Sequence, residues 1–172
     1  MRHAALAAAL LAMSARAHAA PPESEPIRAI AVLRDAAGTQ VGTATLAQDI
    51  HGVRIAIGVK GLPPGKHGFH LHAVGRCDAP HFASAGGHFN PGKKAHGPAG
   101  APSSHAGDLP ELVVGAEGVA QVGFIARGVS LNRGADSLLA GAGTALVLDQ
   151  GPDDGKTDGG GARIACGVVT RR

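Results

Sequence analysis

Five histidines and one aspartate in the middle of the chain have the residue types and the spacing of metal ligands. His70 and His72 are two positions apart, so on a β-strand their side chains project from the same face. The others follow in the next segment: His88, His96, His105 and Asp108. A lone histidine is commonly structural or solvated, but imidazoles gathered with a carboxylate are typical ligands of zinc and copper. The pattern therefore predicts a metal centre.

The segments that carry these ligands indicate two kinds of site. No hydrophobic period holds from residue 73 to 110, and the segment is rich in Gly and Pro, so it cannot fold by burying apolar area. A tetrahedral zinc ion with three His and one Asp would supply the missing folding free energy. A histidine pair on a rigid strand would instead preorganise a second, more exposed metal. A zinc hydrolase is disfavoured, because four protein ligands leave no open coordination position.

The elements that must position the ligands are short strands. Apolar residues alternate with other types in one run: Val53, Ile55, Ile57 and Val59. Other β-prone runs cover residues 27–34, 40–48, 68–72, 111–114, 119–126, 144–148 and 163–170. A Gly/Asp-rich loop occupies residues 149–161. About eight short strands and two long loops predict an all-β fold, an eight-stranded Greek-key barrel or sandwich.

The N-terminus has the composition of a signal peptide. A basic start precedes an apolar run, residues 4–13, that is too short to span a bilayer, and residues 17–19 form an Ala-His-Ala cleavage signal. We expect a signal peptide at 1–19, a short linker at 20–26 and one folded domain at 27–172, located in the periplasm or secreted. Without the signal, 14 basic and 13 acidic residues remain. No basic stripe with interleaved aromatic residues is present, so nucleic acid is not expected as a partner. The sequence contains no other candidate transmembrane segment, so a membrane is not expected as a partner either.

The chain has two cysteines, Cys77 and Cys166. An oxidising compartment favours a disulfide between them over two free buried thiols. In the chain-entropy model, closing a loop of this length would stabilise the fold by about 3–5 kcal/mol.

Several separate motifs resemble copper/zinc superoxide dismutases in order and spacing. They are Gly68-Phe69-His70-Leu71-His72, Ser84 to Pro91 (SAGGHFNP), His96-Gly97, His105 to Leu109 (HAGDL) and Gly161 to Gly167 (GARIACG). The resemblance covers the chain from Ile27 to the C-terminus. It implies the Greek-key fold of that family, superoxide as a small-molecule substrate, and one zinc and one copper as cofactors.

The resemblance also implies a role for each matching residue. The implied copper ligands are His70, His72 and His88. The implied zinc ligands are His88, which would bridge the two metals, with His96, His105 and Asp108. Arg163 would lie beside copper and attract superoxide, while Asp153 would link a zinc histidine to a copper histidine. Cys77 and Cys166 would form the family disulfide, and His67 would have a structural role.

One copper position departs from the family pattern. Relatives read A-L-V-(V/I)-H-x-G-P-D-D where this chain reads ALVLDQGPDD from Ala145, so Asp149 occupies the position of a fourth copper histidine. A carboxylate suits Cu(II) but not the softer Cu(I). We therefore expect Asp149 to ligate oxidised copper at best, to lower the reduction potential and to repel superoxide. The loop that follows is shorter than in relatives, which should open the copper site to solvent and weaken its focusing field.

Two functions therefore compete. The first is a periplasmic superoxide dismutase, a monomer or homodimer, whose copper site is weakened; the retained copper histidines, Arg163 and Asp153 favour it. The second is a zinc-stabilised, copper-poor homologue that binds a partner or buffers copper; Asp149 and the short loop favour it. The superoxide dismutase-like domain of the eukaryotic copper chaperone resembles the second case, with zinc ligands kept and an Asp at this position. That chaperone delivers copper through further cysteine motifs, which this chain lacks.

Overall fold

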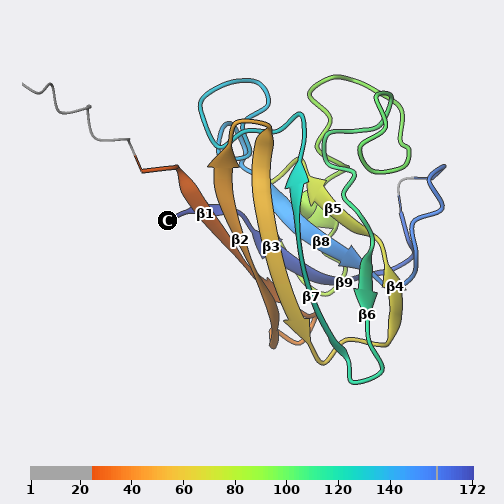
Figure 1. The fold of residues 1–172 in the computed structure, drawn as a ribbon. Helices are drawn as coiled ribbons and strands as arrows, with labels where there is room; N and C mark the ends of the chain where they lie inside the picture. Colours follow the sequence, from red (N-terminus) through yellow and green to blue (C-terminus); the bar gives the residue numbers. More distant parts are fainter. Residues whose placement is uncertain (1–24, 158) are drawn as a thin grey trace, which may run out of the picture.

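Antiparallel strands dominate the computed structural model, which describes residues 25–157 and 159–172 (Figure 1). The main sheet contains β1 (Arg28–Arg34), β2 (Gln40–Asp49), β3 (Gly52–Lys60), β5 (Phe69–His72), β7 (Val119–Ala126), β8 (Ala145–Asp149), β9 (Arg163–Val168) and β10 (Thr170–Arg171). A small second sheet pairs β4 (Gly65–His67) with β6 (Leu112–Val114). A short 3-10 helix, Ala83–Ala85, lies between β5 and β6.

The main sheet curls into a barrel whose neighbouring strands follow the order β5-β8-β9-β1-β2-β3-β7, with β10 paired to β1. β3 pairs with β7 and not with β4, the next strand along the chain, as a Greek-key connection requires. In Figure 1, β1, β2, β3 and β7 form one layer, and β5, β8 and β9 pass behind it. The predicted all-β Greek-key architecture is confirmed.

The barrel core is filled by one face of each strand. The alternation in β3 holds throughout, with buried side chains at Val53, Ile55, Ile57 and Val59. Phe69 and Leu71 of β5 belong to the same core, and Phe69 packs edge-on against Phe124 with 6.3 Å between ring centroids. Because side chains alternate along a strand, this packing directs His70 and His72 to the outer face of the barrel.

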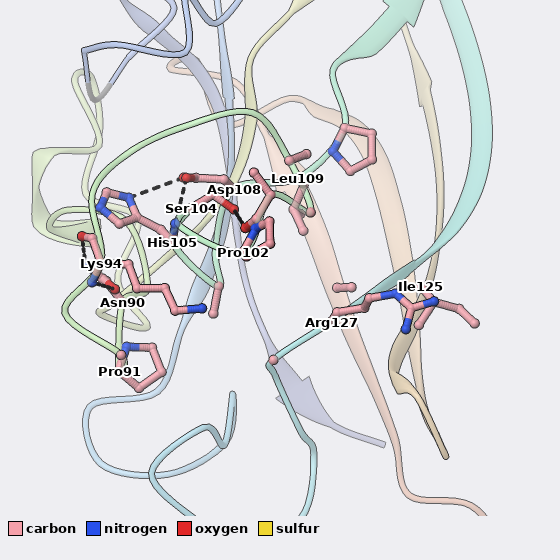
Figure 2. A pocket seen from close by; sticks show the side chains of 18 residues that line it. Asn90, Pro91, Lys94, Pro102, Ser104, His105, Asp108, Leu109, Ile125 and Arg127 are labelled. Carbon is pink, nitrogen blue, oxygen red and sulfur yellow. Dashed lines mark hydrogen bonds and ion pairs between the residues drawn. The ribbon is translucent and has the colours of Figure 1, made fainter.

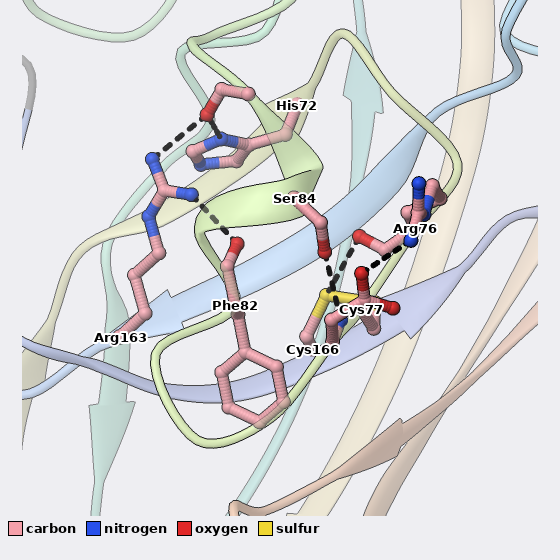
Figure 3. Close-up of a disulfide and its surroundings, with 9 residues drawn as sticks. His72, Arg76, Cys77, Phe82, Ser84, Arg163 and Cys166 are labelled. Carbon is pink, nitrogen blue, oxygen red and sulfur yellow. Dashed lines mark hydrogen bonds and ion pairs between the residues drawn. A yellow bond between two sulfur atoms is a disulfide. The ribbon is translucent and has the colours of Figure 1, made fainter.

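A second apolar cluster covers the outer face of β8 and β9. Its buried members are Phe82, Ala85, Ala145, Val147 and Cys166. Because this cluster and the main core cover opposite faces, all five residues of β8 are buried. Within the cluster, the disulfide Cys77–Cys166 fastens the segment after β5 to β9 (Figure 3). The predicted disulfide is confirmed.

Three features of the fold differ from the expectation. The sequence does not predict β4, which forms by pairing with β6. The expected last strand is divided into β9 and β10. A third long irregular segment, 127–144, accompanies the two at 73–111 and at 150–157 with 159–162. Contacts such as the hydrogen bond from Leu131 N to Gln48 Oε1 (2.7 Å) hold it, and these leave no periodic pattern in the sequence.

The predicted signal peptide, residues 1–19, and most of the predicted linker, 20–26, lie outside the described residues. Both stay predictions. β1 begins at Arg28, one residue after the predicted start of the folded domain. No helix within the described ranges is long and apolar enough to cross a membrane.

Replacing both cysteines with alanine tests the contribution of the disulfide. We expect the free energy of unfolding to fall by about 3–5 kcal/mol, because the bridge joins residues 89 positions apart. Urea unfolding of the metal-free protein measures the difference. A reducing agent should destabilise the wild type by a similar amount and leave the double variant unchanged. Equal losses in both proteins on reduction would show that the stabilisation has another source.

Candidate metal centre

β5 positions the first two histidines. His70 pairs with Val147 and His72 pairs with Ala145 across the β5–β8 ladder. Both histidines therefore share the outer face with these two residues of β8, under the irregular segment 73–111. His70 is 0% and His72 is 1% exposed.

Backbone hydrogen bonds bring the irregular segment back onto β5. Leu71 N donates to Gly107 O (2.9 Å), and Phe89 N donates to Leu71 O (2.8 Å). Gly107 lies where three backbones meet, and a β-carbon there would collide with the carbonyl oxygen of Leu71. Glycine is therefore required at this position. The bridged pairs that result are His70 with Asp108 and His72 with His88.

One cluster of donors has the composition of a zinc site. Its members are His88, His96, His105 and Asp108. Asp108 Oδ1 lies 2.8, 3.1 and 3.3 Å from the Nδ1 atoms of the three histidines, in chain order. Zinc binds nitrogen and oxygen at about 2.0–2.2 Å, so neighbouring donors in a tetrahedral site stand about 3.3 Å apart. The donors fit a zinc ion with small outward shifts.

Backbone groups hold Asp108 in this orientation. Its Oδ2 accepts hydrogen bonds from Gly97 N (3.2 Å) and His105 N (2.9 Å), which leaves Oδ1 directed at the imidazoles. Burial by itself raises the pKa of Asp108, but the hydrogen bond from His88 and the charges of His96 and His105 outweigh it and lower that pKa. Asp108 is therefore a carboxylate ready to bind a cation.

A cavity of about 450 Å³ borders the zinc-type cluster (Figure 2). Its wall includes His105 and Asp108, which face each other in Figure 2, and also Lys94 and Arg127. His70, His72 and His88 are absent from its lining. The cavity therefore borders the zinc-type cluster and not the strand histidines.

The second donor cluster lies on the other side of His88. His70, His72 and His88 have donor nitrogens within 4.8 Å of one another, so His88 belongs to both clusters. His70 Nδ1 and His72 Nε2 are buried and have no hydrogen-bond partner among the described residues. Buried polar atoms normally have partners. A metal ion satisfies such nitrogens, and copper accepts imidazole ligands.

His72 is fixed in the tautomer that a metal requires. Its Nδ1–H donates to Gly86 O (2.8 Å), which leaves the Nε2 lone pair for the cluster. Burial lowers the pKa of His72 to about 3, so the ring is neutral above that pH. Arg163 donates to the same carbonyl (2.8 Å) and to Phe82 O (2.9 Å) (Figure 3). One loop carbonyl thus orients both His72 and the neighbouring arginine.

Asp153 connects the two clusters. Its Oδ2 accepts a hydrogen bond from His70 Nε2 (2.8 Å), and its Oδ1 accepts one from His96 Nε2 (2.9 Å). Burial by itself raises the pKa of Asp153, but these hydrogen bonds outweigh it and lower the pKa to about 2. With Nε2 engaged in this way, each ring presents its Nδ1 to its own cluster.

Asp149, the last residue of β8, lies beside the second cluster. The carboxylate Oδ2 is 3.3 Å from His70 Nδ1 and accepts a hydrogen bond from Gly160 N (3.2 Å). Burial by itself lowers the pKa of His70, but the adjacent carboxylates of Asp149 and Asp153 raise it. Asp149 is not a member of the group of donors within 4.8 Å of one another. It contacts that group through His70.

The side chains of the second cluster are buried, contrary to the expectation from the short loop. His70, His72 and His88 are 0%, 1% and 7% exposed. The prediction of an opened copper site is therefore wrong in this respect. Residues near Gly160 fold back over Asp149, and Gly151 N donates to Gly160 O (2.7 Å). A shorter loop still covers the site because its two ends pair with each other.

Two supporting residues complete the site. His67 is 1% exposed, and its ring nitrogens contact the carbonyl oxygens of Asp149 (2.7 Å) and Pro63 (2.8 Å), in keeping with a structural role. The sequence patterns do not single out Glu111, whose Oε1 accepts a hydrogen bond from Asp153 N (3.2 Å). No motif marks Glu111, because its role depends on where the distant loop is folded.

Asp153→Asn in the metal-free protein tests the bridge between the clusters. The folded pKa of about 2 is below the ordinary 3.8, so the stabilisation is present above pH 3.8 and is lost as the pH falls toward 2. We expect the wild type to be the more stable protein at about pH 5 and the difference to vanish at low pH. Urea unfolding across this range measures it. A difference that is independent of pH would contradict the bridge.

Known proteins are similar to this chain in sequence. A family model described as copper/zinc superoxide dismutase (SODC) matches residues 40–169. The Cu-Zn superoxide dismutase 1 of Aquifex aeolicus is 44% identical, over 77% of this chain and 81% of that protein. The Cu-Zn superoxide dismutase of Escherichia coli strain K12 is 38% identical, over 98% of this chain and 99% of its own.

Solved structures agree with this likeness. A SOD-like protein from Bacillus subtilis matches with a TM-score of 0.77 and 37% identity, over 82% of this chain and 97% of that chain. The clock protein EA4 matches with a TM-score of 0.73 and 34% identity, over 88% of this chain and 98% of that chain. From these likenesses, and from the two clusters that share His88, it follows that this chain belongs to the copper/zinc superoxide dismutase family.

Proposed function

We propose that this chain is an exported superoxide dismutase with one zinc and one copper site, the latter weakened by Asp149. The observation that carries the proposal is the pair of buried nitrogens, His70 Nδ1 and His72 Nε2, on one face of β5. Neither makes a hydrogen bond among the described residues, and His70 Nδ1 has the ion-pair contact with Asp149 at 3.3 Å. Zinc would be held by His88, His96, His105 and Asp108. Copper would be held by His70, His72 and His88. Copper, when bound, supplies the one-electron chemistry that converts two superoxide ions and two protons to oxygen and hydrogen peroxide.

The protein's own groups prepare this chemistry. Asp153 orients His70 and His96 through their Nε2 atoms. A shift of one ring would therefore move Asp153 and, through it, the other ring. Arg163 uses two of its nitrogens to hold Gly86 and Phe82, and the guanidinium has further N–H groups to offer an anion. Its fixed position beside His72 supports a role in attracting superoxide.

Asp149 opposes this reaction electrostatically. Its carboxylate is 3.3 Å from His70 Nδ1 and 4% exposed, so water screens its charge weakly. A negative charge there stabilises the higher oxidation state of a bound metal and repels an approaching anion. Both effects should slow a cycle in which the metal must gain and lose an electron.

Export to the periplasm is part of the proposal. It rests on the composition of residues 1–19 and on the disulfide Cys77–Cys166, because disulfides persist in oxidising compartments. The oligomeric state, monomer or homodimer, stays a prediction.

A second function is favoured by one specific observation. The carboxylate of Asp149 accepts a hydrogen bond from Gly160 N and does not belong to the compact donor group of His70, His72 and His88. Copper would therefore have three histidine ligands. A zinc-stabilised, copper-poor homologue that binds a partner or buffers copper would have this arrangement. The two functions make opposite predictions about turnover, and a copper-poor homologue would also differ in copper content.

Metal content measured together with superoxide turnover separates the two functions. After loading with zinc and copper, the dismutase proposal predicts one equivalent of each metal and turnover that disappears when copper is removed. Protein without bound copper, or protein with copper but no turnover, would favour the second function. A zinc content near zero would contradict both.

Asp149→His tests the proposed cause of the weakened site. We expect the substitution to raise turnover by about 100-fold, the scale of one electrostatic contribution at an active site. Asp136→His, which changes an exposed residue of the segment 127–144, is the matched control and should have little effect. If Asp149→His leaves turnover unchanged, Asp149 does not occupy the position assigned to it.

A further inference from the structure

A short backbone ladder closes the base of the segment 150–162. Gln150 N donates to Ala162 O (2.8 Å), and Gly151 N donates to Gly160 O (2.7 Å). Gly68 N, just before β5, donates to Gly151 O (2.8 Å). Both ends of the segment are thus tied to each other and to the strand that carries His70.

Both the carboxylate and the backbone of Asp149 form hydrogen bonds with residues of this ladder. Its Oδ2 accepts the N–H of Gly160 (3.2 Å), and its backbone N donates to Gly68 O (2.9 Å). A hydrogen bond to an ionised acceptor in a buried place is stronger than a neutral one. Gly160 can approach so closely only as glycine, since a β-carbon would collide with Gly151 O and stand 3.1 Å from Asp149 Cβ.

The segment held in this way carries Asp153. Asp153 bridges His70 and His96, and its backbone N is bonded to Glu111 Oε1 (3.2 Å). Glu111 in turn pairs with Lys66 of β4 (3.2 Å). Two sets of hydrogen bonds therefore hold Asp153 in place. One is the hydrogen bond from its backbone N to Glu111, and the other is the backbone ladder at Gly160, which closes the segment that carries it.

We propose that Asp149 is a positioning residue that latches the segment 150–162 to the end of β8 through Gly160, and so holds Asp153 between the two donor clusters. Its Oδ2, which is 3.3 Å from His70 Nδ1, also accepts the hydrogen bond from Gly160 N (3.2 Å). Its absence from the compact donor group agrees with a role outside the metal coordination sphere. The inference rests on the proposed zinc site for one of its readouts and does not depend on copper or on turnover.

Hydrogen exchange of the metal-free wild type gives the first test. The Gly160 amide, which donates to Asp149, should exchange at least about 100-fold more slowly than that of the adjacent, exposed Gly161. Equal exchange at the two glycines would overturn the proposal without any variant.

Two substitutions at Asp149 give the second test. Asp149→Ala removes the acceptor and should speed exchange at Gly160 by about 10- to 100-fold. Asp149→Asn keeps a carbonyl acceptor of the same size and should restore most of the protection. Asp154→Ala is the matched control, because Asp154 accepts from Lys156 N and Thr157 N (both 2.8 Å) in the same segment. It should leave Gly160 unchanged.

Zinc affinity measured by chelator competition gives a readout that a merely structural contact would not move. Asp149→Ala should lower zinc affinity by about 10-fold, since the freed segment no longer holds Asp153 against His96. Asp149→Asn should restore it. Unchanged exchange and unchanged affinity in Asp149→Ala would overturn the latch. A wild type that binds no zinc would instead overturn the proposed function, while the exchange experiments would still decide the latch.

Discussion

The two hydrogen bonds of Asp153 are the constraint on which the metal centre depends. They join His70, on a strand of the barrel, to His96, on an irregular segment that has no strand or long helix of its own. The disulfide and the hydrogen bonds around Leu71 bring that segment close, and the carboxylate of Asp153 then joins the two rings directly. The fold therefore places one aspartate, from the loop 150–162, between two imidazoles.

The shared histidine gives the centre its chemical character. His88 contributes to both donor clusters, so the charge state of one cluster acts directly on the other through a single ring. A closed set of four donors suits a structural zinc ion, whereas three histidines with a neighbouring arginine suit a metal that meets a small anion. Asp149 adds a negative charge on the second side only. In the proposed function, the zinc site therefore keeps four donors, and Asp149 changes the charge only where copper would bind.

The sequence predicted those parts of the molecule that local patterns encode. The alternation in residues 53–59 identified β3, and the spacing of His70 and His72 put both on one face of a strand. It did not predict β4, which exists only by pairing with β6, or the support of Asp153 by Glu111. Gly86 O accepts hydrogen bonds from both His72 and Arg163. The sequence did not predict this, because every residue type has a backbone carbonyl. The expected opening of the second cluster was wrong, since loop length does not reveal that Gly151 and Gly160 pair.

The central claim is that two metals bind side by side and share His88. Electron paramagnetic resonance of the copper(II) protein tests it most directly, with either zinc or cobalt(II) in the cluster of His88, His96, His105 and Asp108. Zinc is diamagnetic and should leave the copper signal intact, whereas cobalt coupled through the His88 ring should remove or strongly broaden it. A copper signal that is identical with zinc and with cobalt would contradict the account, because it would place copper away from His88.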